Sequence, residues 1–76
     1  MVTVKLLAVL KQYAPNGGTI ELEYSQGMTV ADALSATDIS KATQRYSILV
    51  NGKRKEARDL LSDGDSVTVM PLLAGG

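Results

Sequence analysis

The residues best suited to chemistry in this chain are the two glycines at its end, Gly75 and Gly76. A terminal carboxylate that follows two residues without side chains can enter a narrow channel and reach a remote active site, because no Cβ crowds the reacting carbonyl. The alternative is an ordinary frayed end, since chain termini are often disordered and tolerant of change. The doublet alone does not separate these interpretations, so the choice depends on the rest of the chain.

Side chains that could catalyse a reaction are scarce elsewhere. The chain has no Cys, which excludes a thiolate nucleophile, a disulfide and a zinc–thiolate site, and it has no His, the commonest general base. Its eight Asp and Glu residues are spread along the sequence without an obvious cluster. We therefore expect a protein that is not an enzyme by itself, that has no catalytic or metal-binding residues and that binds no cofactor.

Length and composition indicate one small globular domain. A chain of 76 residues has too limited a core to enclose a substrate pocket of ordinary size. Eight basic and eight acidic residues cancel, so neither a nucleic acid nor an anionic membrane is an expected partner. The apolar segment 2–10 is interrupted by Lys5, is too short to cross a bilayer and lacks the features of a targeting signal. We expect a cytoplasmic protein.

Hydrophobic periodicity predicts the elements that must position the chain end. Period-two alternation and turn signals predict strands at residues 2–6, 19–24, 46–50, 53–56 and 66–70. A helix is expected from about residue 30 to residue 36 or slightly beyond, because Thr29 and Asp32 have the form of a capping box. Short helical turns are expected before Pro15 and at residues 59–61. Asn51 and Gly52 are the strongest short hairpin signal in the chain.

This order of elements predicts an α+β domain of the β-grasp, or ubiquitin-like, class. We expect a mixed sheet of four to five strands packed on one main helix. Pro71 cannot donate to a strand ladder, so it should end the last strand. The expected organisation is a β-grasp domain over residues 1–70, followed by an extended, flexible C-terminal tail over residues 71–76.

Several segments in this order have a familiar form. Residues 4–14 combine a strand with a short helix, 29–34 open a helix, and 50–52 form the Val-Asn-Gly hairpin. Residues 61–67 contain Asp-Gly-Asp before a strand, and 70–76 join an apolar residue and Pro to Ala-Gly-Gly. Together they resemble the ubiquitin-like sulfur carriers, namely the small subunit of molybdopterin synthase (MoaD) and the thiamine-pathway carrier (ThiS). The resemblance covers nearly the whole chain and is greatest for MoaD.

The resemblance implies that partners supply the chemistry. An E1-like adenylating enzyme of the MoeB or ThiF type would use ATP and magnesium to adenylate the Gly76 carboxylate. A sulfur donor would then convert the adenylate to a thiocarboxylate. A large synthase subunit of the MoaE type, or thiazole synthase, would receive the inserted tail and its sulfur. The tail-insertion residues implied by the resemblance are Pro71, Leu72, Leu73, Ala74 and Gly75.

Apolar residues near both ends of the chain are candidates for a partner interface beside the tail. Leu7 and Met70 fall on the outward phase of their strands, Val9 is close by, and exposed apolar patches mark interfaces. The alternative is that some of these side chains pack under loops. We expect Leu7, Val9 and Met70 to contact partners, with Leu72 and Leu73 extending the patch.

The remaining distinctive residues have simpler interpretations. The basic run 53–55, with Arg58, is expected to be a hairpin edge protected by charge, and the alternative is a contact with an acidic groove. The three tyrosines, Tyr13, Tyr24 and Tyr46, are expected in the core or at its rim. We do not expect them to stack on nucleic-acid bases, because the chain has no other aromatic residue and no positive surface around them.

Four functions remain open. The first is sulfur delivery for molybdopterin, the precursor of the molybdenum or tungsten cofactor, which the opening segment and the Pro-containing tail favour. The second is sulfur delivery for thiazole synthesis. The third is a protein modifier that forms isopeptide bonds to lysines, and the fourth is an interaction module that only shares the fold.

Overall fold

A computed structural model describes residues 1–14, 16–42 and 45–72 of the chain. Its sheet contains β1 (Val2–Leu6), β2 (Thr19–Leu22), β3 (Tyr46–Val50), β4 (Lys53–Lys55) and β5 (Ser66–Pro71). The strand order is β2-β1-β5-β3-β4. β1 and β5 are parallel, and the other neighbours are antiparallel. The helices are α1 (Val30–Leu34) and the 3₁₀ helices η1 (Ala8–Tyr13), η2 (Asn16–Gly18) and η3 (Ile39–Lys41).

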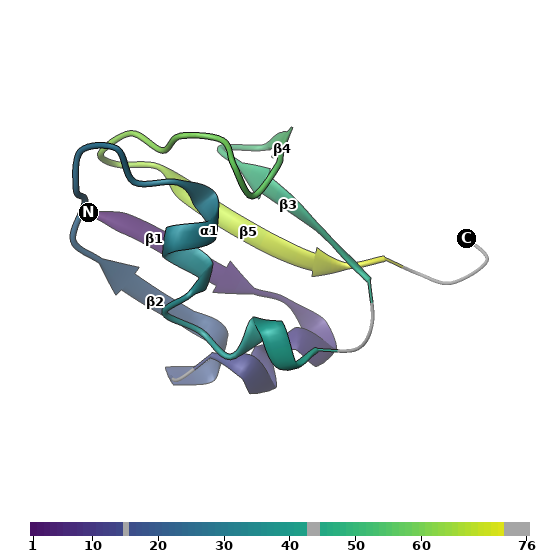
Figure 1. Ribbon diagram of the computed structural model, residues 1–76. Helices are drawn as coiled ribbons and strands as arrows, with labels where there is room; N and C mark the ends of the chain where they lie inside the picture. The colour runs from purple at the N-terminus through teal and green to yellow at the C-terminus, as the bar shows by residue number, and fades with distance from the viewer. Residues whose placement is uncertain (15, 43–44, 73–76) are drawn as a thin grey trace.

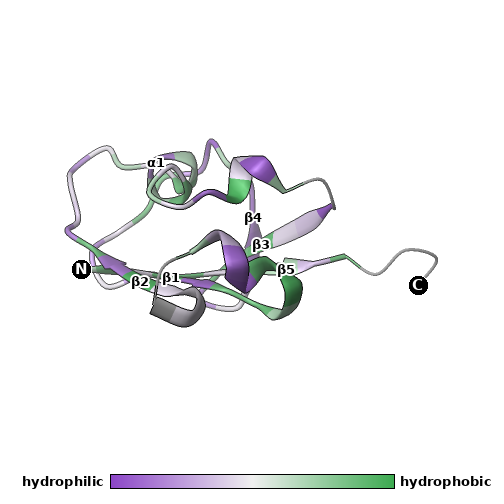
Figure 2. Ribbon diagram, turned by 90° about the horizontal axis from the view of Figure 1, so that it is seen from below, coloured by the Kyte–Doolittle hydropathy of each residue, from purple (hydrophilic) through white to green (hydrophobic). Residues whose placement is uncertain are grey.

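The sheet and the helix form two layers. Helix α1 crosses one face of the sheet (Figure 1), and Figure 2 shows the sheet nearly edge-on with α1 on one side. The alternation in β1 buries Val2, Val4 and Leu6 toward this helix. The buried apolar core consists of Val2, Val4, Leu6, Leu10, Val30, Ala33, Leu34, Ile39, Val50, Leu61, Val67 and Val69. This arrangement confirms the predicted β-grasp fold.

The β3–β4 hairpin turns where the sequence predicted. Asn51 and Gly52 have φ values of 53° and 84°, as a two-residue hairpin loop of this handedness requires. The Asn51 side chain also ties the loop to the start of β5, because its Oδ1 accepts from the Ser66 N–H at 2.9 Å. Its Nδ2 donates to Asp65 Oδ1 at 2.8 Å. Asn51 therefore fixes both the hairpin and its neighbouring strand.

The predicted capping box at the start of α1 is present. The Asp32 N–H donates to Thr29 Oγ1 at 3.2 Å, and the Thr29 N–H donates to Asp32 Oδ2 at 2.9 Å. The helix ends at Leu34, shorter than the expected 30–36, as the Ser35 hydroxyl donates to the Asp32 carbonyl at 2.6 Å. Such local side-chain bonds compete with continued helix formation.

Residues 59–61 do not form the predicted helical turn. The Asp59 carbonyl accepts from the Val30 N–H at 2.9 Å, and the Ala57 carbonyl accepts from the Ala31 N–H at 2.8 Å. Leu60 forms an isolated bridge with Thr29. The first amides of α1 lack partners within the helix, so they recruit these carbonyls and hold this segment in an extended form.

Two strand ends differ slightly from the prediction. β2 ends at Leu22 rather than at residue 24, and β5 continues through Pro71, one residue beyond the expected end of the domain. Pro71 needs no N–H donor there, because its nitrogen faces away from β3 and toward the side where β1 has already ended at Leu6. The three tyrosines are partly buried against the core, as predicted.

Candidate functional site

The base of the C-terminal tail is held by the start of β3. Pro71 pairs with Tyr46, and the Leu72 N–H donates to the Arg45 carbonyl at 2.9 Å. Of the predicted tail-insertion residues, the structure therefore places Pro71 and Leu72. Leu73, Ala74, Gly75 and the predicted attachment residue Gly76 lie outside the described residues.

The parallel pairing of β1 and β5 brings two predicted interface residues together. The register pairs Leu6 with Val69, and the Leu7 N–H donates to the Val69 carbonyl at 3.0 Å. Continuing this register by one residue places Leu7 beside Met70. Both are half-buried and lie on the face opposite the core, since their neighbours Leu6 and Val69 point inward.

Val9 and Leu72 extend this apolar surface. Val9 is 52% exposed and Leu72 is 46% exposed, although both are large apolar side chains. Ala8 has a φ of 54°, which turns the chain out of β1 into η1, where Leu10 is buried and Val9 is not. Figure 2 shows the apolar start of η1 near the end of β5, and the two elements are in contact. We call Leu7, Val9, Met70 and Leu72 the tail-base patch.

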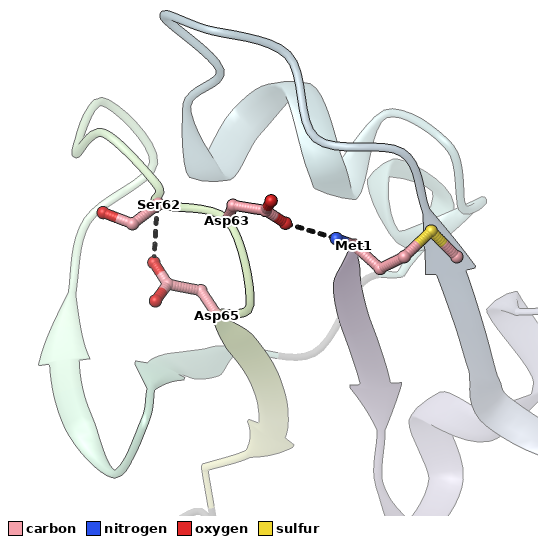
Figure 3. Close-up of polar contacts among 4 residues, drawn as sticks. All are labelled: Met1, Ser62, Asp63 and Asp65. Atoms are coloured by element: carbon pink, nitrogen blue, oxygen red, sulfur yellow. Dashed lines mark hydrogen bonds and ion pairs between the residues drawn. The ribbon is translucent and has the colours of Figure 1, made fainter.

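The carboxylate with the clearest pKa shift lies at the other end of the sheet. The N-terminal ammonium of Met1 donates to Asp63 Oδ1 (Figure 3). This hydrogen bond, and next the charge of the ammonium, lower the pKa of Asp63 below its ordinary value of 3.8. Beside it, the Ser62 N–H donates to Asp65 Oδ2 at 2.7 Å. These contacts close the loop that precedes β5, at the end of the sheet opposite the tail-base patch.

The described residues contain no group of three or more His, Cys, Asp or Glu side chains that could hold a metal ion. Within the same residues, no helix is long and apolar enough to cross a membrane. In the described residues, β5 ends at Pro71, and the half-buried side chains of Leu7 and Met70 lie beside this strand end.

Sequence reasoning did not find the role of Arg45. Its backbone carbonyl fixes Leu72, and no side-chain pattern marks a carbonyl that will accept a hydrogen bond from a distant strand. An indirect signal came from the residues that follow Arg45, since 46–50 were predicted to form a strand.

Solved structures of proteins from Haloferax volcanii and Trypanosoma brucei have the same fold. SAMP1 from Haloferax volcanii is 22% identical, with a TM-score of 0.78 over 99% of this chain and 98% of that one. A second structure, of the H. volcanii small archaeal modifier protein 1, is 21% identical, with a TM-score of 0.76 over 95% and 97% of the two chains. Urm1 from Trypanosoma brucei is 18% identical, with a TM-score of 0.71 over 99% and 94%.

These identities are low, so the structures support the fold alone. A sequence-family model is more specific, because the model of the ThiS family matches residues 4–76. The match begins within β1, covers the tail-base patch and includes the glycine doublet. The chain therefore belongs to the ThiS family of small ubiquitin-like proteins, as its motifs predicted.

Proposed function

We propose that this protein is a sulfur carrier that receives sulfur on the carboxyl group of Gly76 and delivers it for molybdopterin synthesis in the cytoplasm. The observation that carries the proposal is the family match, which continues to residue 76 and so includes the Ala-Gly-Gly end. The absence of Cys from the sequence agrees with it, because no side chain of this protein could carry the sulfur as a persulfide.

The proposed reaction has two steps at one carbon atom. In the first, a Gly76 carboxylate oxygen attacks the α-phosphorus of ATP on the activating enzyme, and magnesium pyrophosphate leaves. In the second, a hydrosulfide equivalent from the sulfur donor attacks the acyl carbon, and AMP leaves. The product is a thiocarboxylate. A free carboxylate is a poor acyl donor, and adenylation supplies the leaving group that it lacks.

In this proposal the folded body positions the tail. The hydrogen bond from Leu72 to Arg45 anchors the point where the tail begins. The tail-base patch would dock first on the E1-like activating enzyme and then on the large synthase subunit. Pro71, Leu72, Leu73, Ala74 and Gly75 would lie at or in the channel of each partner and bring Gly76 to its active site.

Thiazole synthesis is the second candidate, and the family that matches is itself named for ThiS. We favour molybdopterin because the apolar, Pro-containing end of β5 resembles the MoaD tail. The protein-modifier function is the third candidate, and the fold likeness to small archaeal modifier protein 1 is compatible with it.

Reconstitution with alternative acceptors tests the proposal. The charged carrier is mixed either with a MoaE-type subunit and the molybdopterin precursor, or with thiazole synthase and its substrates. We expect the thiocarboxylate to be consumed and molybdopterin to form only in the first mixture. Thiazole formation would support the second candidate, and a covalent adduct on protein lysines would support the third. Deleting Gly76 should abolish transfer without unfolding the domain, because a chain end contributes little to packing.

A further inference from the structure

The edge of β3 is open at its first residue, Tyr46. In an antiparallel pair, the N–H and C=O of one residue point to the same neighbouring strand, and the direction alternates along the chain. The Arg45 carbonyl accepts from the Leu72 N–H, and the Asn51 N–H donates to the Ser66 carbonyl, so both residues face β5. Tyr46 is one residue beyond Arg45, and its N–H and C=O therefore face the opposite side, toward β4.

β4 does not reach this position. It pairs with Ile48, Leu49 and Val50 only, and the continued register would place Ala57 opposite Tyr46. The backbone of Ala57 turns toward α1 instead of β3, because its carbonyl accepts from the Ala31 N–H at 2.8 Å. Within residues 1–14, 16–42 and 45–72, no backbone hydrogen bond outside the ladders involves the Tyr46 peptide group. The capping of α1 thus leaves a donor and an acceptor of β3 at an open strand edge.

Two depressions adjoin this edge, and Tyr46 lines both. The first, about 480 Å³, lies along the edge and is also bounded by Ile48, Arg54 and Lys55. The second, about 360 Å³, is mainly apolar and lies between Tyr46, Leu34 of α1 and Ala57. A strand added at the open edge would lie in the first depression. The side chain of the peptide residue opposite Tyr46 would lie on the same face of the sheet as the Tyr46 side chain, and it would point toward the second depression.

The charges around the edge favour an acidic occupant. Lys53, Arg54 and Lys55 are exposed and form no ion pair with another described residue. The nearby carboxylates already have partners: Glu56 Oε2 lies 3.1 Å from Arg58 Nε, and Asp59 Oδ2 accepts from the Glu56 N–H at 2.7 Å. Arg54 and Lys55 line the first depression together with these two carboxylates, whereas Lys53 lies at the hairpin turn opposite Val50. Among the described residues, Arg54 and Lys55 are therefore the cations beside the edge that an acidic occupant could meet.

We propose that the open edge of β3 at Tyr46 binds an extended peptide segment of a partner protein, with an apolar residue opposite Tyr46 and acidic residues flanking it. The peptide would add one strand by backbone hydrogen bonds, and its side chains would supply specificity. Since Tyr46 pairs with Pro71 on its other side, the docked peptide would lie one strand away from the base of the tail. The site does not depend on the chemistry proposed for Gly76.

Binding of a capped heptapeptide that alternates aspartate with valine tests this site. Amide NMR spectra of the isotope-labelled chain should show saturable shifts at Tyr46, Ile48 and Ala57. The double variant Arg54→Glu, Lys55→Glu should bind this peptide about tenfold more weakly, because two attractive charges become repulsive. The variant should instead bind a peptide that alternates lysine with valine. Lys5→Glu is the control, since Lys5 is an exposed cation in β1, and it should leave binding unchanged.

Peptide N-methylation separates strand addition from simple charge attraction. Methylating the amides on one alternating set of the aspartate–valine peptide should abolish binding, because those amides face β3, and methylating the other set should not. Equal effects of both sets would overturn the proposal. So would shifts confined to residues 53–55, shifts at β2 in place of Tyr46, or no saturable binding.

Discussion

Gly18 lies where the chain passes closely over the end of β1. Its φ is 100°, and a Cβ at this position would be 2.8 Å from the Leu6 carbonyl oxygen and 2.8 Å from Lys11 Cγ. Gly17 has a φ of 74°, but a Cβ there would meet nothing within 4 Å. Replacing Gly17 would therefore introduce backbone strain alone, whereas replacing Gly18 would introduce both strain and a steric clash.

We expect Gly18→Ala to lower the free energy of unfolding by about 2 kcal/mol or more, because strain and a backbone clash combine. Gly17→Ala, the matched control, should cost about 1 kcal/mol from strain alone. Urea denaturation followed by circular dichroism measures both. Equal losses in the two variants would show that the Leu6 contact has no effect.

Asp63 should make stability depend on pH. Its pKa in the folded chain is lowered by the Met1 ammonium, so the unfolded chain binds a proton more readily. The stabilisation is therefore fully present above the unfolded pKa, about 4, and is lost as the pH falls toward the lower folded pKa.

The stability difference between the wild-type chain and Asp63→Asn should accordingly shrink as the pH is lowered from 7 to about 3. Denaturation midpoints at several pH values measure this difference. The control is Glu21→Gln, which changes an exposed carboxylate of β2 that has no ion pair with another described residue. Its denaturation midpoint should match that of the wild-type chain at pH 7. A difference for Asp63→Asn that grew toward acid would contradict the assigned ion pair.

At the scale of elements, α1 is short and depends on its N-terminal contacts. The Thr29 side chain and the carbonyls of Ala57 and Asp59 satisfy the amides of its first turn. Thr29→Ala should lower the free energy of unfolding by about 1 kcal/mol, the usual effect of losing such a cap. Ser40→Ala, at an exposed hydroxyl in η3, should change it by less than about 0.5 kcal/mol. Thermal denaturation compares them, and equal effects would argue against the capping box.

The strands and the hairpin were predictable because their signals are local. The alternation in β1 and β5 and the Asn51–Gly52 turn each depend on a few adjacent residues. The extended form of residues 59–61 was not predictable, since it depends on amides of α1 about thirty positions away in the chain. The open edge at Tyr46 has the same origin, because those amides direct Ala57 away from β3. At the candidate site, the outward phases of Leu7 and Met70 were predictable, whereas the anchoring carbonyl of Arg45 was not.

The two ends of the sheet differ in character. The loop before β5, with Asp63, closes one end, and the tail-base patch occupies the other. Parallel pairing of β1 and β5 is what places the start of η1 beside the start of the tail. Val9 and Leu72 are therefore exposed on the side from which a partner that receives the tail would approach, whereas Met1 and Leu60 are exposed elsewhere on the body.

Val9→Lys tests the role of the tail-base patch. Because Val9 is 52% exposed, we expect stability within about 0.5 kcal/mol of wild type. Binding to the activating enzyme should weaken by about tenfold, because a charge would enter an apolar interface. The control is Leu60→Lys, since Leu60 is 71% exposed and lies beside Thr29. Calorimetry that showed equal binding losses for both variants would argue against a specific role of the patch.

We propose that the carboxyl group of Gly76 carries sulfur, and intact-protein mass spectrometry detects this sulfur directly. The full chain is incubated with an E1-like activating enzyme, magnesium ATP and a sulfur donor, and the chain without Gly76 is treated in parallel. We expect exchange of one oxygen for one sulfur, located by fragmentation at Gly76 and absent from the shortened chain. Sulfur on any other residue, or no exchange with activating enzymes of either the MoeB or the ThiF type, would contradict it.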